Sequence, residues 1–201
     1  MKSLEKIIPL QHPDDESETA YSIEKKTPKE ARQLYAKAKA NLLDVNHWHD
    51  FAGKGSADFQ LTDEQGHPVT GILKKGYYFR INIRSTTTGT DKYDWVKVED
   101  IEEGHIDGVS DWTIVKIKPV EQSLPYSGEL THFFSASASS NFFVKRQRHK
   151  VTAAIFGRSE KPDAAIKGFW EKFRISIIGI LRLIGFNRPQ WKQLVKGILR
   201  K

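Results

Sequence analysis

The chain has 201 residues and a mass of 23.0 kDa, with 38% hydrophobic, 28% charged and 11% aromatic residues. This composition is typical of a soluble globular protein with an aromatic core, and it excludes a disordered chain. The absence of cysteine excludes disulfides, thiolate metal sites and cysteine nucleophiles, so we expect a reducing compartment and a cytoplasmic location. The most apolar run, residues 175–186, contains Arg182 and is shorter than the roughly 20 residues of a membrane span.

The basic charge of the chain is concentrated near its C-terminal end. The formal net charge is +7. Residues 161–201 hold ten Lys and Arg side chains against Asp163 and Glu171, whereas residues 1–160 are close to neutral. Such asymmetry permits contact with nucleic acid, anionic lipid or an acidic protein. A solvated basic face on a terminal helix is the simpler interpretation, because the tail has no basic run longer than two residues.

The first elements along the chain are a loose segment, a short strand and a helix. Residues 1–18 are acidic, contain proline and have too few apolar residues for a signal-peptide core, so we expect a flexible segment and no secretion. Residues 19–26 predict a short edge strand. Thr27, Pro28 and Glu30 then form a helix start with an N-cap, a proline in the first turn and a capping-box glutamate. The apolar side of this helix consists of Ala31, Leu34, Tyr35, Ala38, Leu42 and Val45.

The stretch HWHD, residues 47–50, lies where this helical pattern ends. On a continuing helix His47 and His49 would point to nearly opposite sides, so they could not chelate one ion. A zinc or iron site would also need a third ligand, and the remaining candidates are distant or wrongly spaced. We therefore interpret HWHD as a corner of the fold in which Trp48 closes one end of the core.

Between residues 57 and 160 the apolar period changes to two, which is typical of strands. One strand places Tyr77, Phe79, Ile81 and Ile83 on one side and Tyr78, Arg80, Asn82 and Arg84 on the other. Further strands are predicted at 94–101, 112–120, 131–136, 141–147 and 151–158. The basic stretch 145–150 predicts a solvated hairpin between the last two. Because the connections are short, we expect the strands to be antiparallel.

After Pro162 the apolar period becomes helical again. An apolar stripe along residues 166–184 predicts a long helix that ends at Gly185, and residues 187–201 predict a short basic amphipathic helix. We therefore expect a flexible segment (1–18), a single domain (19–186) and a basic C-terminal helix (187–201).

The order of these elements is strand, helix, antiparallel strands and long apolar helix. In this order, and in the stretch IEKKTPKEARQLYAKAKANLLDVNHWHDFAG followed by ADFQLTD, the chain resembles the START-like, or helix-grip, superfamily. The resemblance implies an α+β fold, with a curved antiparallel sheet of about six or seven strands, an N-terminal helix and a long C-terminal helix across the sheet. It also implies a cavity between sheet and helix that holds a lipid, sterol, polyketide or other apolar molecule, in some members for catalysis. No individual site residue transfers with it.

The function that we predict is a module that binds an apolar or amphipathic small molecule in such a cavity. The large rings of this chain are difficult to pack at native density, so we expect an apolar cavity of at least about 300 Å³. Either Arg80 or Arg84 would hold an acidic head group by bidentate hydrogen bonds. If their side of the strand faces water, the row is an ordinary solvated surface. The predicted ligand-binding residues are Tyr78, Arg80, Asn82, Arg84, Trp170 and Phe173.

Two alternatives stay open at this point. The first is a basic peripheral module that docks on an anionic membrane or on nucleic acid through the C-terminal helices, with Arg188, Lys192, Lys196 and Arg200 as contacts. The second is a cyclase or hydrolase-type enzyme that uses the same cavity, although the sequence has no GxSxG motif. We predict no catalytic residue, no metal ligand and no cofactor, and the sequence leaves the oligomeric state open.

Overall fold

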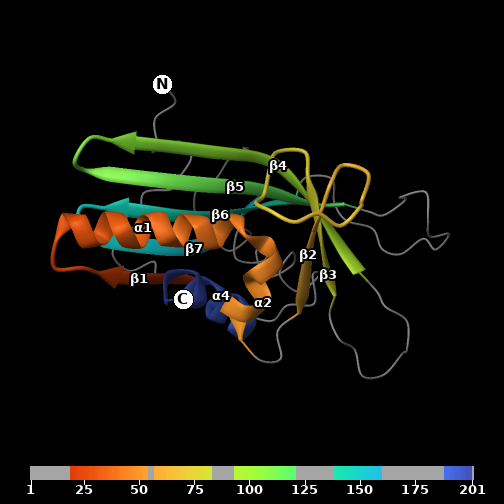
Figure 1. Ribbon diagram of the computed structural model, residues 1–201, viewed down its shortest axis with the longest axis horizontal. Helices are drawn as coiled ribbons and strands as arrows, with labels where there is room; N and C mark the ends of the chain where they lie inside the picture. Colours follow the sequence, from red (N-terminus) through yellow and green to blue (C-terminus); the bar gives the residue numbers. More distant parts are fainter. Residues whose placement is uncertain (1–18, 54–56, 83–92, 121–137, 160–187, 201) are drawn as a thin grey trace, which may run out of the picture.

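The computed structural model describes residues 19–53, 57–82, 93–120, 138–159 and 188–200, and Figure 1 labels its helices and strands. In chain order the elements are β1 (Ala20–Glu24), α1 (Pro28–Leu43), the 3₁₀ turn η2 (Val45–His47), α2 (Trp48–Ala52), β2 (Asp58–Thr62), β3 (Tyr78–Asn82), β4 (Tyr93–Ile106), β5 (Ser110–Val120), β6 (Ala138–Gln147), β7 (Lys150–Ser159) and α4 (Arg188–Arg200). This order confirms the predicted α+β class, with a helix after the first strand and a helix after the last.

The described strands form one antiparallel sheet in the order β1-β7-β6-β5-β4-β3-β2. The sheet is strongly curved, and β2 and β3 run steeply across the direction of β5 to β7 in Figure 1. The register of β4 against β5 shifts between Val98 and Asp100, which marks a β-bulge. Bulges bend a strand and increase its twist, so this one contributes to the curvature.

Some predictions concern residues that the structure does not describe, and one predicted strand has different bounds. The predicted strand 131–136 and the apolar stripe 166–184 lie outside the described residues, as do Arg84, Trp170 and Phe173. β4 is longer than the predicted strand 94–101, because its pairing with β5 continues to the hairpin turn.

α1 begins at the predicted residue. The Thr27 side chain accepts a hydrogen bond from the Glu30 N–H at 3.2 Å, and Pro28 occupies the first turn. The Glu30 carboxylate accepts from the N–H of Lys26 at 3.2 Å, one residue before the N-cap, so the capping box is displaced by one position. The predicted apolar side is confirmed by the buried residues Ala31, Ala38 and Leu42.

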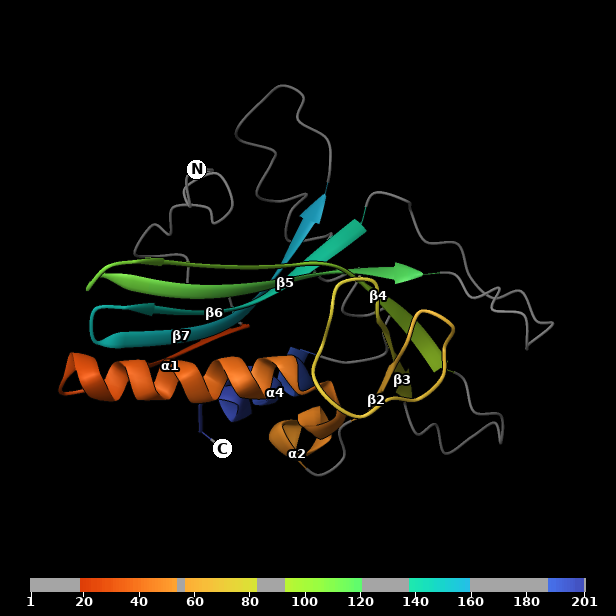
Figure 2. The ribbon, with the colours of Figure 1, turned by 45° about the horizontal axis from the view of Figure 1, so that its top comes forward.

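The helices α1, α2 and α4 pack on one face of the sheet, which we call the inner face (Figure 2). Alternate strand residues reach it and are at most 5% exposed: Phe59, Leu61, Phe79, Ile81, Val96, Val98, Val115, Ile117, Phe142, Val144, Val151, Ala153 and Ile155. Because successive strand side chains alternate, the residues between them point to the opposite face, which we call the outer face.

α4 is part of the core on the inner face. One side of this helix is nearly inaccessible to solvent, with exposures of 0–2% for Trp191, Leu194, Val195, Ile198 and Leu199. At Gly197 an added Cβ would lie 2.0 Å from the carbonyl oxygen of Phe51, so α4 contacts the backbone of α2 directly. The apolar side of the basic C-terminal helix is therefore used for folding.

The hairpin between β6 and β7 corrects one expectation. The hairpin exists, but Arg146 is not solvated; it is 2% exposed and points to the inner face. Asp111 lies opposite Arg146 in the register, and its carboxylate accepts a hydrogen bond from the Arg146 Nε. The guanidinium also donates to the carbonyl of Arg148 at 3.1 Å. The Asp111 carboxylate and the Arg148 carbonyl reach Arg146 only in the folded chain. Their hydrogen bonds compensate for the loss of hydration when the guanidinium is buried.

Candidate functional site

The HWHD stretch forms the corner that the sequence predicts. His47 ends the 3₁₀ turn and His49 lies on α2, and both imidazoles are exposed. His47 Nδ1 is 2.7 Å from a carboxylate oxygen of Asp44, and this hydrogen bond raises the pKa of His47. His49 Nε2 lies 3.2 Å from Asp50. Each imidazole therefore faces its own carboxylate rather than a shared centre.

Aromatic rings fill the space where α2 and α4 meet the inner face of the sheet. Trp48 is fully buried, and its ring centroid lies 5.5 Å from that of Phe59 and 5.6 Å from that of Phe79. Phe142 lies 4.9 Å from Trp48 and 5.5 Å from Trp191. Aromatic rings at these separations are in contact. Side chains therefore occupy the space between this part of the sheet and α4.

Three of the predicted ligand-binding residues lie on β3 and point to the outer face. Tyr78, Arg80 and Asn82 alternate with the buried Phe79 and Ile81, and all three are half-buried. They therefore point away from α1, α2 and α4. Their half-burial also distinguishes the row from a fully solvated surface.

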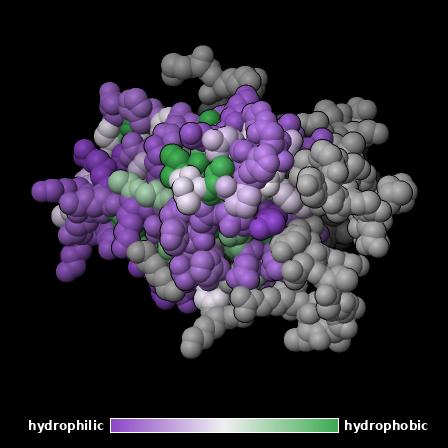
Figure 3. Space-filling model, turned by 45° about the vertical axis from the view of Figure 1, so that its right-hand side comes forward, coloured by the Kyte–Doolittle hydropathy of each residue, from purple (hydrophilic) through white to green (hydrophobic). Residues whose placement is uncertain are grey.

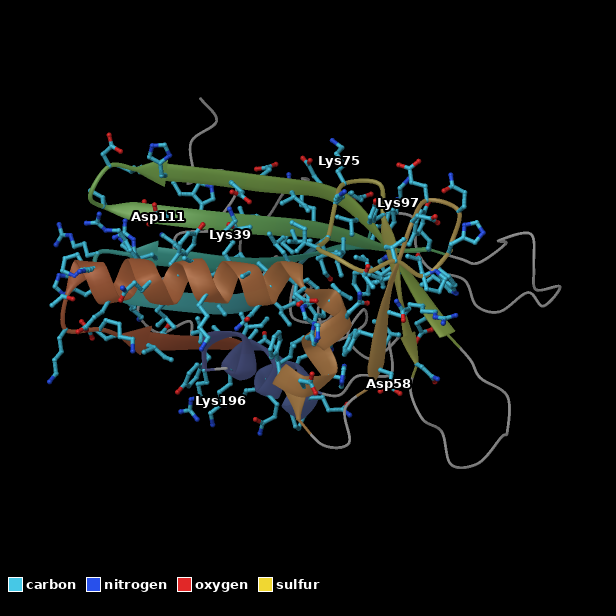
Figure 4. All side chains as sticks on the ribbon, in the orientation of Figure 1. Lys39, Asp58, Lys75, Lys97, Asp111 and Lys196 are labelled. Atoms are coloured by element: carbon cyan, nitrogen blue, oxygen red, sulfur yellow. The ribbon has the colours of Figure 1, made fainter. Side chains whose placement is uncertain are left out.

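The register of the sheet extends this row onto two neighbouring strands. Trp95 of β4 lies opposite Arg80, and Lys97 of β4 lies opposite Tyr78. Lys118 of β5 lies opposite Lys97. Trp95 is 8% exposed, and both lysines are half-buried. We call these five residues the basic–aromatic surface, and Lys97 is labelled in Figure 4.

The two opposed lysines have an unusual electrostatic environment. Lys97 Nζ lies 5.6 Å from the ring centroid of Tyr78, within the range of a cation–π contact. Within the described part of the chain, neither Lys97 nor Lys118 has a carboxylate at ion-pair distance. Like charges directly opposite each other on adjacent strands destabilise a sheet. An anion bound between the two side chains would therefore stabilise the fold.

Neighbouring lysines differ from this pair, because acidic residues of β4 neutralise them. Lys116, two residues before Lys118 on the same face of β5, forms an ion pair with Glu102. Lys75, in the connection before β3, lies 3.2 Å from a carboxylate oxygen of Asp100. The carboxylates of Asp100 and Glu102 on β4 therefore form ion pairs with Lys75 and Lys116, and not with Lys97 or Lys118.

An apolar cluster adjoins these charges on the outer face. Ile114, Phe143 and Ala154 are 1–4% exposed and pack with Trp112 and Ala20. The outer face is therefore amphipathic, with basic side chains toward one end of β5 and apolar side chains toward the other.

Lys145 is a further outer-face lysine with no carboxylate partner among the described residues. It lies between Trp112 and Thr152 in the register of the sheet. Burial lowers the pKa of Lys145, because a half-buried ammonium group loses part of its hydration. The outer face thus holds several cations in surroundings that favour a bound anion.

The predicted contacts of the C-terminal helix lie apart from this surface, on the exposed side of α4. Lys192 is exposed, whereas Lys196 and Arg200 lie over the ring of Tyr21 at 5.8 and 5.0 Å from its centroid. Arg200 also donates a hydrogen bond to the Tyr21 hydroxyl. The side chain of Arg188 lies outside the described part. Figure 4 places Lys196 and Lys97 on different parts of the molecule.

Sequence reasoning missed Trp95, Lys97 and Lys118 as site residues. The period of two in β4 places Trp95 and Lys97 on one side of their strand, and that signal is present in the sequence. Their position beside Arg80 depends on the register of β4 against β3 and β5. Register joins residues that are distant in the sequence, so local periodicity does not reveal it.

Comparisons with known proteins add little to this geometry. No family model matches the sequence, and no curated protein matches it. The crystal structure of Ara h 8.0201 aligns with 90% of this chain and 98% of its own, at 10% sequence identity and a TM-score of 0.35. A TM-score this low supports no argument about function. None of the described helices is long and apolar enough to cross a membrane.

Proposed function

We propose that the protein binds an anionic amphipathic small molecule on the outer face of the sheet, with the acidic group between Lys97 and Lys118. The observation that supports this most is the direct opposition of the two half-buried lysines without a carboxylate among the described residues. A carboxylate or phosphate between them replaces a repulsion by two charge-assisted hydrogen bonds. The ligand would therefore supply the negative charge that the described residues do not place beside these two lysines.

The remaining residues of the basic–aromatic surface supply specificity. Arg80 lies on the strand next to Lys97, and its planar guanidinium suits a bidentate contact with the same acidic group. Tyr78 and Trp95 offer ring surface for the apolar part of the ligand. Asn82, on the same side of β3, extends the site. Arg84, Trp170 and Phe173 stay predictions, because they lie outside the described residues.

The proposed site differs in place from the cavity that the sequence suggested. The predicted cavity lies between the sheet and the helix expected at 166–184, which is outside the described residues, so that cavity stays a prediction. Against α4, contacts of the Phe142 ring with Trp48 and Trp191 fill the inner face with side chains. The outer face carries the predicted polar row of β3 and the unneutralised cations. The proposed ligand lies within the class predicted from the sequence, because the residues on the outer side of β3 still indicate an acidic head group with an apolar part.

Thermal unfolding with matched ligands tests the proposal. Decanoate and decyl phosphate should raise the melting temperature with increasing concentration, because a ligand that binds only the folded state stabilises it. Neutral decanol, with the same chain length, should raise it less. The difference should shrink as salt is added, because salt screens the contacts with the partly exposed lysines. Comparison of the two acids shows whether the site prefers carboxylate or phosphate.

Single substitutions locate the site. Lys97→Gln and Lys118→Gln should each weaken the binding of decanoate and leave the response to decanol unchanged. Lys116→Gln is the matched control, because Lys116 lies on the same face of β5 but already pairs with Glu102. Equal stabilisation by decanoate and decanol, unaffected by Lys97→Gln, would show that the proposal is wrong.

A further inference from the structure

Three connections meet at one end of the sheet, at the left in Figures 1 and 2. They join β1 to α1, β4 to β5, and β6 to β7, and we call them together the hairpin end. Its parts are held by backbone hydrogen bonds: the N–H of Lys25 donates to the carbonyl of His149 at 2.9 Å, and the N–H of Arg148 donates to the carbonyl of Val109 at 2.7 Å. The three connections therefore form one surface.

The buried side chain of Arg146 connects two of the three connections that form this surface. Arg146 pairs with Asp111 and donates to the carbonyl of Arg148, so it links the β4–β5 and β6–β7 hairpins. Arg148 itself adopts a left-handed backbone conformation, with φ of 52°. Non-glycine residues adopt this conformation rarely, so contacts around it must hold it in place. The hairpin end is preformed rather than shaped by a partner.

Two aliphatic side chains project from the hairpin end. In the described part of the chain, the exposed large hydrophobic residues are Ile72, Ile106 and Val109, at 51%, 51% and 41% exposure. Ile106 ends β4 and Val109 follows in the same tight turn, whose Gly108 has φ of +67°. Ile72 lies in the connection between β2 and β3. Figure 3, which brings the opposite end of the molecule forward, shows a face that is largely hydrophilic apart from a small hydrophobic group.

Cations lie along the hairpin end to one side of the two aliphatic side chains, on the connections of β6, β7 and β1. Among the described residues at the ends of the three connections, the cationic groups not used by the buried pair are Lys25, Lys26, Arg148 and Lys150. Lys26, Arg148 and Lys150 are exposed. The carboxylates there are Glu24, Glu30, which accepts a hydrogen bond from the Lys26 N–H, and the fully exposed Asp107, which lies 3.5 Å from His105. The hairpin end thus has a net positive charge beside an apolar tip.

We propose that the hairpin end docks on an anionic phospholipid bilayer, with Ile106 and Val109 inserted among the head groups and the neighbouring cations against lipid phosphates. Exposed aliphatic residues and Lys or Arg contribute together to interfacial binding of this kind. The tip is convex, and two side chains form no complementary pocket for a protein partner. The tip also lacks the aromatic platform that single-stranded nucleic acid binds.

The C-terminal helix is a weaker candidate for the same role. Its apolar residues Trp191, Leu194 and Ile198 are 0–1% exposed, so α4 offers cations without side chains that could insert. The hairpin end offers both.

Co-sedimentation of the full chain with vesicles tests the proposal. Binding is expected to equimolar phosphatidylserine and phosphatidylcholine vesicles, with little binding to pure phosphatidylcholine, and should fall steeply with salt. An Ile106→Ser, Val109→Ser double variant should bind at least about tenfold more weakly, because it loses the inserted aliphatic groups. Lys26→Gln and Lys150→Gln should each reduce binding about fivefold. The melting temperature of each variant verifies that it folds.

Two matched controls make the result decisive. Ile72→Ser removes an equally exposed isoleucine away from the hairpin end, and it should leave vesicle binding unchanged. Lys116→Gln, at a lysine that already pairs with Glu102 and lies outside both proposed sites, should also leave it unchanged. The proposal is overturned if the full chain does not bind anionic vesicles at low salt, or if Ile72→Ser weakens binding as much as the double variant. If the protein sediments in the absence of vesicles and the Ile106→Ser, Val109→Ser double variant does not, the two aliphatic side chains mediate self-association instead, and the proposal is overturned.

Discussion

The inner and outer faces of the sheet bury side chains for different purposes. Among the described residues, the inner face packs against α1, α2 and α4 and contains aromatic rings in contact, and its buried charge, Arg146, has a carboxylate partner. The outer face also buries apolar residues. Its lysines Lys97, Lys118 and Lys145 are half-buried, and no carboxylate among the described residues forms an ion pair with them. Packing explains the inner face. The outer-face lysines, which have no carboxylate partner among the described residues, are the basis of the proposed anion binding.

Removal of a tryptophan from each face should show which face holds the fold together. Trp48→Ala is expected to lower the free energy of unfolding by about 3–5 kcal/mol, because it removes a fully buried ring in contact with three others. Trp112→Ala should cost less, since Trp112 is half-buried on the outer face. Urea unfolding of both variants measures the difference. Equal costs would contradict the assignment of the main core to the inner face.

The ion pairs of the two faces should differ in the same direction. Arg146→Met removes a 2% exposed cation and leaves Asp111 unpaired, and the expected cost is about 3 kcal/mol, since breaking a buried pair costs about 3–5. We expect the lower end because the Asp111 side chain is 26% exposed and water can reach it. Lys116→Met, which breaks a partly exposed pair with Glu102, should cost about 1 kcal/mol or less. Chemical denaturation checks both values.

Two glycines provide a further contrast in packing. Gly197→Ala on α4 would place a Cβ 2.0 Å from the backbone oxygen of Phe51, so it should cost about 1–3 kcal/mol by overpacking, despite the higher helix propensity of alanine. Gly104→Ala on β4 would place a Cβ 2.1 Å from the ring of Trp112, which is a side chain and can move. Its cost should be smaller. Thermal unfolding distinguishes the two, and a stabilised Gly197→Ala variant would mean that α4 does not contact α2 so closely.

Replacement of Lys145 should have a small effect on the free energy of unfolding, and this effect should depend on pH. Burial lowers its pKa in the folded state, so between the folded and unfolded pKa values the unfolded chain binds more protons and stability rises with pH. Lys145→Met should therefore stabilise the protein at neutral pH. This gain should shrink as pH rises toward the ordinary lysine pKa of about 10.4. Unfolding at several pH values measures it, with the exposed Lys192→Met as control; a gain that does not change with pH would point to packing instead of charge.

Local sequence signals predicted most of the fold. The capping residues Thr27 and Glu30 located the start of α1, and alternation around Phe79 and Ile81 assigned the two faces of β3 correctly. Trp48 was correctly placed as the buried residue of a corner. These features depend on neighbours within a few positions, where helix and strand geometry decide which side a residue occupies.

The candidate site was less accessible to sequence reasoning. The opposition of Lys97 and Lys118 depends on strand register, and the bulge between Val98 and Asp100 changes that register along β4. The burial of Arg146 depends on Asp111, which is 35 positions away in the sequence. Such contacts arise only when the sheet assembles, so periodicity within one strand carries no information about them.

A double-mutant cycle on Lys97 and Lys118 tests the central claim most directly. The free energy of unfolding is measured for the wild type, Lys97→Gln, Lys118→Gln and the double variant, with and without decanoate. Without ligand the cycle should give a repulsive coupling of about 0.2–1 kcal/mol, as expected for like charges on adjacent strands. With decanoate the coupling should become attractive, because the acidic group joins the two lysines. A coupling near zero that decanoate does not change would contradict the assignment of the outer face to anion binding.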